Sequence, residues 1–259
     1  MKKYKSIWIS DLHLGTPSCK ADNICLFLKQ HNCDQLYLVG DIIDGWRLNR
    51  RWHWPQSHSN VIRRLITKAK RGTKITYITG NHDEFIRDWV KLSLIFGNIR
   101  IVNEATHIGV DGKRYLVTHG DMFDSITRNY RWISLLGDVA YETLLKINTV
   151  LNKTRKWFGC GYWSFSKYIK INVKQAANFI CNFEQHLVNH ALKEGYHGVI
   201  CGHIHFPEIK MLNNTVYMNT GDFVETCSAL VENYDGSFEI LQLINGDMIT
   251  VNHFIIKDI

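Results

Sequence analysis

The sequence predicts an α/β fold, and three observations support this class. Short apolar runs that end in polar residues recur along the chain of 259 residues, as expected for buried strands. Amphipathic helical patterns lie between the early runs. The turn sequences VDGK, NNT, YDGS and NGD separate the later runs, which is typical of hairpins. The chain is long enough for one large domain or two small ones, each with a substantial core.

Eight segments are predicted as strands because each is short and rich in β-branched, aromatic and other apolar residues. They cover residues 6–10, 35–40, 74–80, 113–119, 198–202, 214–219, 228–233 and 238–244. Together they account for most of the apolar clusters outside the helical patterns.

Two segments show helical periodicity. In residues 60–71, one face carries Val61, Ile62, Leu65, Ile66 and Ala69. Gly72 stands where a helix C-cap is expected. The long segment from about 125 to 194 is also predicted to be mostly helical, and Gly195 ends it.

The composition is that of a folded protein of a reducing compartment. Hydrophobic residues make up 45% and charged residues 21%. The seven cysteines form no CxxC pair, which favours buried free thiols. Asp11 and His13 interrupt the first apolar stretch too early for a signal peptide, and no apolar run approaches the ~20 residues of a membrane span. A cytoplasmic location is expected, with peripheral attachment to the inner face of the cytoplasmic membrane as the alternative.

The net charge of +7 is concentrated in one segment. Residues 125–190 hold nine Lys or Arg against three Asp or Glu, and eleven of the 31 aromatic residues. A basic, aromatic segment suggests an anionic partner: a phosphorylated substrate, an anionic lipid surface or nucleic acid. The structural alternative is a helical subdomain with a solvated basic face. No protein partner is evident from the sequence.

Polar side chains directly follow five of the predicted strands. They are Asp11 and His13, Asp41 and Asp44, Asn81, His82 and Asp83, His119 and Asp121, and His203 and His205. Taken singly, an Asx-turn would explain Asp11, and a helix cap would explain residues 81–83. Five strand ends together predict one shared site, because loops at the carboxyl ends of strands converge.

The chemistry of these side chains predicts a centre of two divalent metal ions. Carboxylate oxygens, imidazole nitrogens and an amide oxygen, without thiolates, suit Mn²⁺ as the first choice, with Fe or Zn²⁺ as alternatives. Two neighbouring ions clamp the attacking and leaving oxygens of an in-line displacement. The expected reaction is therefore the hydrolysis of a phosphoric ester or anhydride.

The ordered motifs resemble those of the calcineurin-like metallophosphoesterases. These motifs are D-x-H at 11–13, GD-x-x-D at 40–44, GNHD at 80–83, H-G-D at 119–121 and GH-x-H at 202–205. The resemblance implies a four-layer α/β/β/α sandwich that forms a single domain over 1–259. Residues 125–194 would be a helical insertion, or lid, within it, and the tail from 206 onward would belong to the second sheet.

The resemblance also implies a role for each motif residue. One metal would be held by Asp11, His13 and His205, and the second by Asn81, His119 and His203, with Asp41 bridging the two. His82, oriented by Asp83, would stabilise the phosphoryl charge or protonate the leaving oxygen. Asp44 and Asp121 would hold ligand histidines in position.

Within this family, SDLHLG, GDIIDGW and the long insertion are similar to the UDP-2,3-diacylglucosamine pyrophosphatases of lipid A biosynthesis. That branch implies a lipid-linked nucleotide-sugar substrate. The basic, aromatic residues 155–170 would suit an acylated anionic substrate at a membrane face. The pyrophosphatases have Arg in the place of His82, so the resemblance leaves the substrate open.

Two other functions remain as alternatives. A nuclease or nucleotide phosphodiesterase would use residues 47–54, RLNRRWHW, to bind phosphates and stack bases. Trp46 and Arg47 follow Asp44 closely and are the predicted substrate-binding residues, although packing and solvation would equally explain this loop. A non-catalytic scaffold is the third alternative, but it would be expected to lose ligands, and every expected ligand is present.

Overall fold

The computed structural model of the chain describes residues 2–90, 95–123, 180–244 and 247–255. The chain divides into two compact units, Met1–Asp121 with Leu187–Ile259, and Met122–His186. The first unit contains all the strands of the described residues and all the predicted site residues. Of the predicted helical insertion, residues 125–179 lie outside the described residues, and 180–193 are helical.

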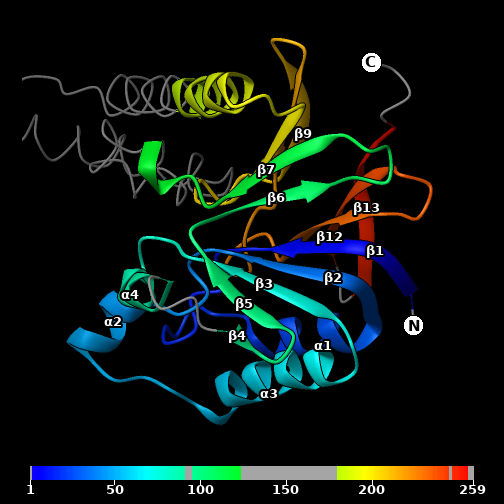
Figure 1. Cartoon of the computed structure of the whole chain (residues 1–259). Helices are drawn as coiled ribbons and strands as arrows, with labels where there is room; N and C mark the ends of the chain where they lie inside the picture. Colours follow the sequence, from blue (N-terminus) through cyan, green and yellow to red (C-terminus); the bar gives the residue numbers. More distant parts are fainter. Residues whose placement is uncertain (1, 91–94, 124–179, 245–246, 256–259) are drawn as a thin grey trace, which may run out of the picture. The chain divides into compact units, whose positions relative to one another are not determined.

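The first unit contains an eight-stranded sheet (Figure 1). In spatial order its strands are β13 (Asp247–Phe254), β12 (Phe238–Ile244), β11 (Ser228–Glu232), β1 (Lys2–Ile9), β2 (His31–Val39), β3 (Lys74–Ile78), β5 (Ile99–Val102) and β4 (Ile95–Phe96). β1, β2, β3 and β5 are parallel, whereas β11 to β13 and β4 pair antiparallel. The carboxyl ends of β1, β2 and β3 therefore reach one edge of the sheet.

A five-stranded sheet forms the second layer. Its order is β6 (Glu104–Ile108), β7 (Arg114–Thr118), β8 (Gly198–Cys201), β10 (Thr215–Asn219) and β9 (Glu208–Leu212). β7, β8 and β10 are parallel, and β6 and β9 are antiparallel edges. The expectation that the whole tail from 206 onward joins this sheet is wrong, because β11 pairs with β1 and carries β12 and β13 into the larger sheet.

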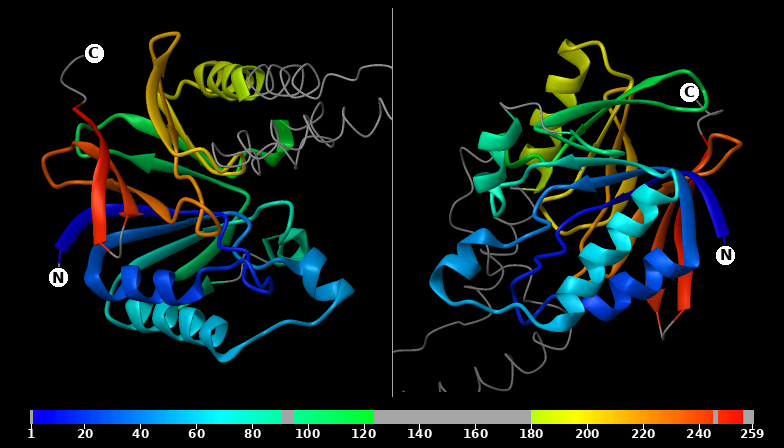
Figure 2. Two further views of the ribbon diagram at one scale, coloured as in Figure 1. Left: turned by 180° about the vertical axis from the view of Figure 1, so that it is seen from behind. Right: turned by 60° about the horizontal axis from the view of Figure 1, so that its bottom comes forward.

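Two longer helices, α1 (Ala21–Gln30) and α3 (Gln56–Lys70), cover one face of the eight-stranded sheet (Figures 1 and 2). Shorter helical segments follow the early strands: α2 (Gly45–Arg50), η1 (Glu84–Ile86), α4 (Arg87–Val90) and η2 (Asp121–Phe123). The predicted helix at 60–71 is the second half of α3. Its Val61, Leu65 and Ala69 are buried as expected, but Ile66 is exposed.

Both faces of the sheet are buried at its central strands β1, β2 and β3, which explains why these strands are apolar at successive positions. Ile7 and Leu36 belong to the core beneath α1 and α3. Trp8 and Tyr37 point to the opposite face, where they stack at 5.3 Å and join a core with residues of the smaller sheet. The predicted α/β class, with two sheets flanked by helices, is confirmed.

No helix in the described ranges is long and apolar enough to cross a membrane.

Candidate metal centre

Five loops bring the predicted site residues together. The loop after β1 continues to pair with the loop after β2 beyond the strands, through Asp11 N–H to Gly40 O at 3.1 Å and His13 N–H to Asp41 O at 3.0 Å. The loops after β7 and β8 are joined by Gly202 N–H, which donates to His119 O at 3.3 Å. The loops thus come from both sheets, whereas the sequence predicted that they would meet at the edge of one open sheet.

The backbone of these loops is strained where the site residues lie. Asp11, His13, Asp41, His203 and His205 all have a positive φ, between 49° and 72°. This left-handed region is uncommon for residues other than glycine and costs on the order of 1–3 kcal/mol for each residue. Strain of this kind concentrates at functional sites, and the surrounding hydrogen bonds maintain it here.

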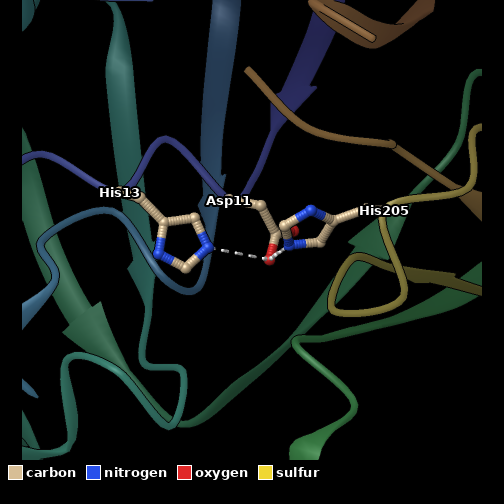
Figure 3. A group of neighbouring side chains, drawn as sticks. All are labelled: Asp11, His13 and His205. Atoms are coloured by element: carbon tan, nitrogen blue, oxygen red, sulfur yellow. Dashed lines mark ion pairs between the residues drawn. The ribbon is translucent and has the colours of Figure 1, made fainter. Parts of the chain in front are cut away.

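The first cluster consists of Asp11, His13 and His205, whose ligand atoms lie within 4.8 Å of one another. Figure 3 shows the Asp11 carboxylate between the two imidazoles. Asp11 Oδ1 lies 3.1 Å from His205 Nε2 and 4.0 Å from His13 Nε2. The other oxygen, Oδ2, accepts from the Ser10 hydroxyl and from His203 N–H. Asp11 is completely buried, so its position is fixed.

The second cluster is Asp41, His119 and His203, again with ligand atoms within 4.8 Å. His119 donates from Nδ1 to Val39 O at 2.9 Å, which fixes its tautomer and directs Nε2 into the site. Asn81 follows β3 next to this cluster in the GNHD loop. The structure thereby groups six of the seven predicted ligands into two clusters.

Asp41 lies between the clusters. Its Oδ2 faces three imidazole nitrogens, His119 Nε2 at 3.4 Å, His82 Nε2 at 3.9 Å and His13 Nε2 at 4.0 Å. Its Oδ1 accepts from His82 N–H at 2.8 Å. One oxygen anchored by the backbone and one surrounded by ligand nitrogens is the arrangement that a bridging carboxylate requires.

The electrostatics of these residues are strongly coupled. Burial opposes ionisation of Asp11, but the adjacent His205 outweighs it and lowers the pKa of Asp11 to about 2. Burial likewise disfavours the His205 imidazolium, and the Asp11 charge raises the pKa of His205 to about 9. For Asp41, the surrounding histidines overcome burial and lower its pKa. Without metal, a proton on His205 therefore takes the place of a cation beside Asp11.

Asp44 holds two histidines with one oxygen. Its Oδ2 lies 3.1 Å from His13 Nδ1 and 2.9 Å from His82 Nδ1. Its Oδ1 accepts from Arg47 N–H at 2.8 Å and caps α2. Burial opposes its ionisation, but these hydrogen bonds lower its pKa. The position expected for Asp44 beside ligand histidines is thus the one the structure shows.

The carboxylate beside His82 is that of Asp44, and Asp83 lies elsewhere. Asp83 is completely buried and accepts from Tyr77 OH at 2.6 Å, Gly80 N–H at 2.5 Å and Ile42 N–H at 3.0 Å. It therefore fixes the backbone of the GNHD and GDIID loops, and the orienting role expected of it at His82 falls to Asp44.

The remaining predicted residues occupy the periphery. The Asp121 carboxylate accepts from Arg87 at 2.5 Å, and its negative charge also acts on His119. Trp46 lies over His82, with ring centroids 4.3 Å apart, and its Nε1 donates to Glu84. Arg47 is exposed, and its backbone N–H completes the cap of α2.

Sequence reasoning missed a sixth loop, residues 219–226, which begins at the last residue of β10. Ser10 is buried, and its Oγ lies 2.6 Å from Thr220 Oγ1 and 2.8 Å from Gly221 O, while Phe223 N–H donates to Asp11 O. Through Ser10 and Phe223, these contacts hold the carboxylate and the backbone of Asp11 in place. The signal was present, because the polar residues NTGD follow the apolar run of β10 as in the other five loops.

The donor atoms fit divalent cations. Asn81 Oδ1 is buried and has no hydrogen-bond partner among the described residues, and the buried Asp11 Oδ1 and His119 Nε2 have only their contacts with His205 and Asp41. Such atoms cost about 1–3 kcal/mol each when left unsatisfied. Oxygen and imidazole nitrogen donors without thiolate suit Mn²⁺, Fe or Zn²⁺. Bound divalent cations therefore explain the arrangement of these donor atoms better than contacts within the protein do.

Three curated proteins illustrate the similarities of the chain. It is 24% identical over 134 residues to a UDP-2,3-diacylglucosamine hydrolase of Porphyromonas gingivalis, covering 49% of the chain and 50% of that protein. It is 24% identical over 251 residues to a DNA polymerase II small subunit of Methanothermobacter thermautotrophicus, covering 83% and 46%. A UDP-2,3-diacylglucosamine hydrolase of Wigglesworthia glossinidia brevipalpis is 21% identical over 228 residues, covering 82% and 84%.

The matches to the first two relatives span about half the length of each. The family model described as calcineurin-like phosphoesterase matches residues 4–207, which include all five strand-end motifs and both candidate clusters. The match covers most of the chain and includes the loops whose geometry is described above. The chain therefore belongs to the calcineurin-like phosphoesterase family.

Proposed function

We propose that this protein is a two-metal phosphoesterase that hydrolyses a pyrophosphate or phosphodiester bond. The observation that carries the proposal is the pair of clusters around Asp41 Oδ2, with buried ligand atoms that the described protein groups leave unsatisfied. One metal would be held by Asp11, His13 and His205, the other by Asn81, His119 and His203, and Asp41 would contact both. Bound ions would supply Lewis acidity and activate water.

The protein groups around the ions would position substrate and transfer protons. Asp44 Oδ2 lies 2.9 Å from Nδ1 of His82, and the imidazole presents Nε2 toward Asp41 and the space between the clusters. In its charged form His82 Nε2 would donate a hydrogen bond to the phosphoryl group or protonate the leaving oxygen. Trp46 covers the ring and limits its contact with water. Asp83 contributes by fixing the loop that carries His82 and Asn81.

The substrate that we propose is a lipid-linked or nucleotide-sugar pyrophosphate, such as UDP-2,3-diacylglucosamine. Support comes from the named hydrolases among the relatives, one of which matches over 84% of its own length. Large apolar side chains are also exposed near the GNHD and GHIH motifs: Trp46, Phe85, Trp89 and Phe206. Such side chains suit a ligand with apolar or ring-shaped groups next to its phosphates.

The experiment combines metal analysis with hydrolysis. Purified protein is expected to bind two equivalents of Mn²⁺ and to hydrolyse bis(p-nitrophenyl) phosphate or UDP-2,3-diacylglucosamine when Mn²⁺ is added. Asp41→Asn is expected to lose both properties. A folded protein with two bound metals and no activity on any diester or pyrophosphate would overturn the proposal.

A second candidate is a nuclease or nucleotide phosphodiesterase. The loop after α2 favours it, because Trp52 is 73% exposed and lies near Trp54, with Arg50 and Arg51 beside them. Exposed tryptophans with arginines can stack bases and bind phosphates. A panel of single-stranded DNA, a cyclic nucleotide and UDP-2,3-diacylglucosamine separates the candidates. Trp52→Ala should reduce nuclease activity and leave pyrophosphate hydrolysis within about twofold.

A further inference from the structure

A basic cavity lies at the amino-terminal ends of the parallel strands, away from the metal clusters. It measures about 740 Å³ and is bounded by β1, β2, the start of β3 and the carboxyl-terminal turns of α1 and α3. Along β1, Lys5 and Asp11 are six residues apart, which corresponds to about 20 Å of extended chain. The cavity is therefore separate from the candidate metal centre.

The charge of this cavity is one-sided. Among the described residues that line it are seven Lys or Arg and one acidic residue, Asp34. Asp34 is shared between Lys3 at 3.2 Å and Lys5 at 3.7 Å. The five other cations are Lys29, Arg64, Lys68, Arg71 and Lys74.

Helix dipoles account for only part of this charge. α1 and α3 both end at the cavity, and the carboxyl terminus of a helix carries about −0.5 of a charge. Two such ends offset about one positive charge, so a net excess of about five remains in a concave surface. A positive cavity of this kind focuses the field and attracts anions.

One of the cations is built into the floor of the cavity. Lys68 is only 6% exposed, and its Nζ donates to His31 O at 2.6 Å and to Asn32 Oδ1 at 3.0 Å. These contacts fix the ammonium group at the junction of α3 and β2. Burial lowers the pKa of Lys68, and the charges of Arg64 and Arg71 act in the same direction. A bound anion would relieve that repulsion.

The shape and lining of the cavity indicate the class of ligand. Its volume lies within the range of small-molecule sites, roughly 300–1,000 Å³. No aromatic side chain is among its described lining residues, so it offers no stacking surface for bases. The apolar residues that line it, Leu28 and Cys33, are buried and cannot insert into a bilayer. The recognisable feature is clustered positive charge with two guanidinium groups.

We propose that this cavity binds a compact anion with two or more phosphate groups, held by Arg64, Arg71 and Lys74 around the fixed ammonium of Lys68. Guanidinium groups bind phosphates in bidentate fashion, and an ammonium group adds a point charge. The phosphates can belong to a free polyphosphate or to a lipid headgroup. The site is independent of phosphoester hydrolysis at the metal centre.

The test compares two double variants, each of which removes two positive charges on or near α3. Arg64→Gln with Lys74→Gln removes two lining cations, whereas Arg63→Gln with Lys70→Gln removes two exposed cations of α3 that do not line the cavity. Binding is measured by calorimetry with tripolyphosphate, and by co-sedimentation with vesicles that contain a bisphosphorylated phosphoinositide. All proteins are also measured in an Asp41→Asn background, which removes binding through the metals.

In at least one arm, the protein is expected to bind and the lining variant to bind at least about tenfold more weakly. The exposed-surface variant should stay within about twofold of the parent. The arm that shows this pattern identifies the source of the phosphates. Absence of binding at millimolar ligand in both arms, or equal weakening by both variants, would overturn the proposal. If Asp41→Asn fails to fold, unchanged Mn²⁺-dependent hydrolysis in the lining variant provides the evidence that the two sites are separate.

Discussion

The two carboxylate oxygens of Asp44 have different contacts. Substitutions of Asp44 can therefore separate the orientation of the histidines from the capping of α2. Oδ2 orients His13 and His82, while Oδ1 caps the short helix α2. An asparagine at this position keeps an oxygen for the cap but loses the negative charge that both imidazoles face. An alanine loses both.

We therefore expect Asp44→Asn to weaken metal binding by about 10–100-fold, because residues behind metal ligands orient them. Asp44→Ala should show the same loss and an additional decrease of about 1 kcal/mol in the free energy of unfolding, from the missing cap. Calorimetric Mn²⁺ titration and urea unfolding of metal-free protein measure the two effects. Equal stability of the two variants would show that the cap contributes nothing.

The pair of Asp11 and His205 predicts how the metal-free protein responds to pH. His205 has its pKa raised from 6.5 to about 9, so its contribution to stability is complete below pH 6.5 and is lost as the pH rises through 9. Asp11 has its pKa lowered from 3.8 to about 2, so its contribution is present above pH 3.8 and is lost as the pH falls through 2. This pair stabilises most between these limits.

Chelator-treated protein should therefore melt at a lower temperature at pH 9.5 than at pH 6. The drop should be smaller in His205→Gln, which lacks the proton that is lost. Scanning calorimetry at both pH values tests this expectation. An unchanged drop in the variant would assign the pH dependence to other groups.

At the scale of elements, the site depends on loops that approach each other closely. Gly40 has a φ of +76°, and a Cβ at this position would lie 2.3 Å from the ring of His119. The loop after β2 therefore touches a candidate ligand, His119, supplied by the loop after β7. Gly72, after α3, also has a positive φ of +97°, but a Cβ there would meet nothing within 4 Å.

These two glycines form a matched pair for mutagenesis. Gly72→Ala should cost only the left-handed strain, about 1–2 kcal/mol. Gly40→Ala should cost about 1–3 kcal/mol more because of overpacking, and should abolish metal binding by displacing His119. Urea unfolding and Mn²⁺ titration measure both results. Normal metal binding by Gly40→Ala would contradict the tight placement of His119.

The sequence identified interior strands better than edge strands. The strands at the ends of the two sheets, β4, β13, β6 and β9, were all missed, as was β5 next to β4. β13 illustrates the reason, because none of its eight residues is buried, five of them are exposed, and its apolar positions alternate with polar ones less regularly. Edge strands carry polar residues that prevent pairing with other chains, so their sequences resemble loops.

At the scale of the whole molecule, a buried contact between a histidine and a glutamate connects the two sheets. His107 on β6 contacts Glu232 on β11 through Nε2 and Oε2 at 2.9 Å, and its Nδ1 lies 3.1 Å from Tyr37 OH. Both side chains are at most 1% exposed. No local sequence pattern predicts this pair, because the partners are 125 positions apart.

Removing one partner should be costly because the other remains buried without compensation. We expect Glu232→Ala to lower the free energy of unfolding by about 3–5 kcal/mol. The double variant with His107→Ala should be less destabilised than the sum of the single variants. Urea unfolding of the four proteins in this cycle measures the coupling, and strict additivity would contradict it.

Metal binding should stabilise the whole molecule, since its ligands come from loops of both sheets. Saturation at about 1,000 times the dissociation constant corresponds to about 4 kcal/mol. The melting temperature should fall on chelation and recover with Mn²⁺, while Asp41→Asn should not respond. A metal-independent melting temperature in the parent protein would count against a metal centre that joins the two sheets.

The sequence by itself determined the α/β class and the set of polar residues that gather at the strand ends. Short apolar runs followed by Asp, His or Asn are local signals, because a strand and the turn after it are encoded by neighbouring residues. The resemblance of the motifs to a known family added the expected place of Asp44 beside ligand histidines. These conclusions need no knowledge of how distant segments pair.

Only the tertiary structure decided which segments share a sheet and which side chain acts on which. Asp44 and not Asp83 lies beside His82, the loop at 219–226 supports Asp11, and β11 joins β1 in place of the smaller sheet. Each of these outcomes depends on contacts between residues far apart in the chain. Such contacts follow from the packing of the complete core, which no local pattern encodes.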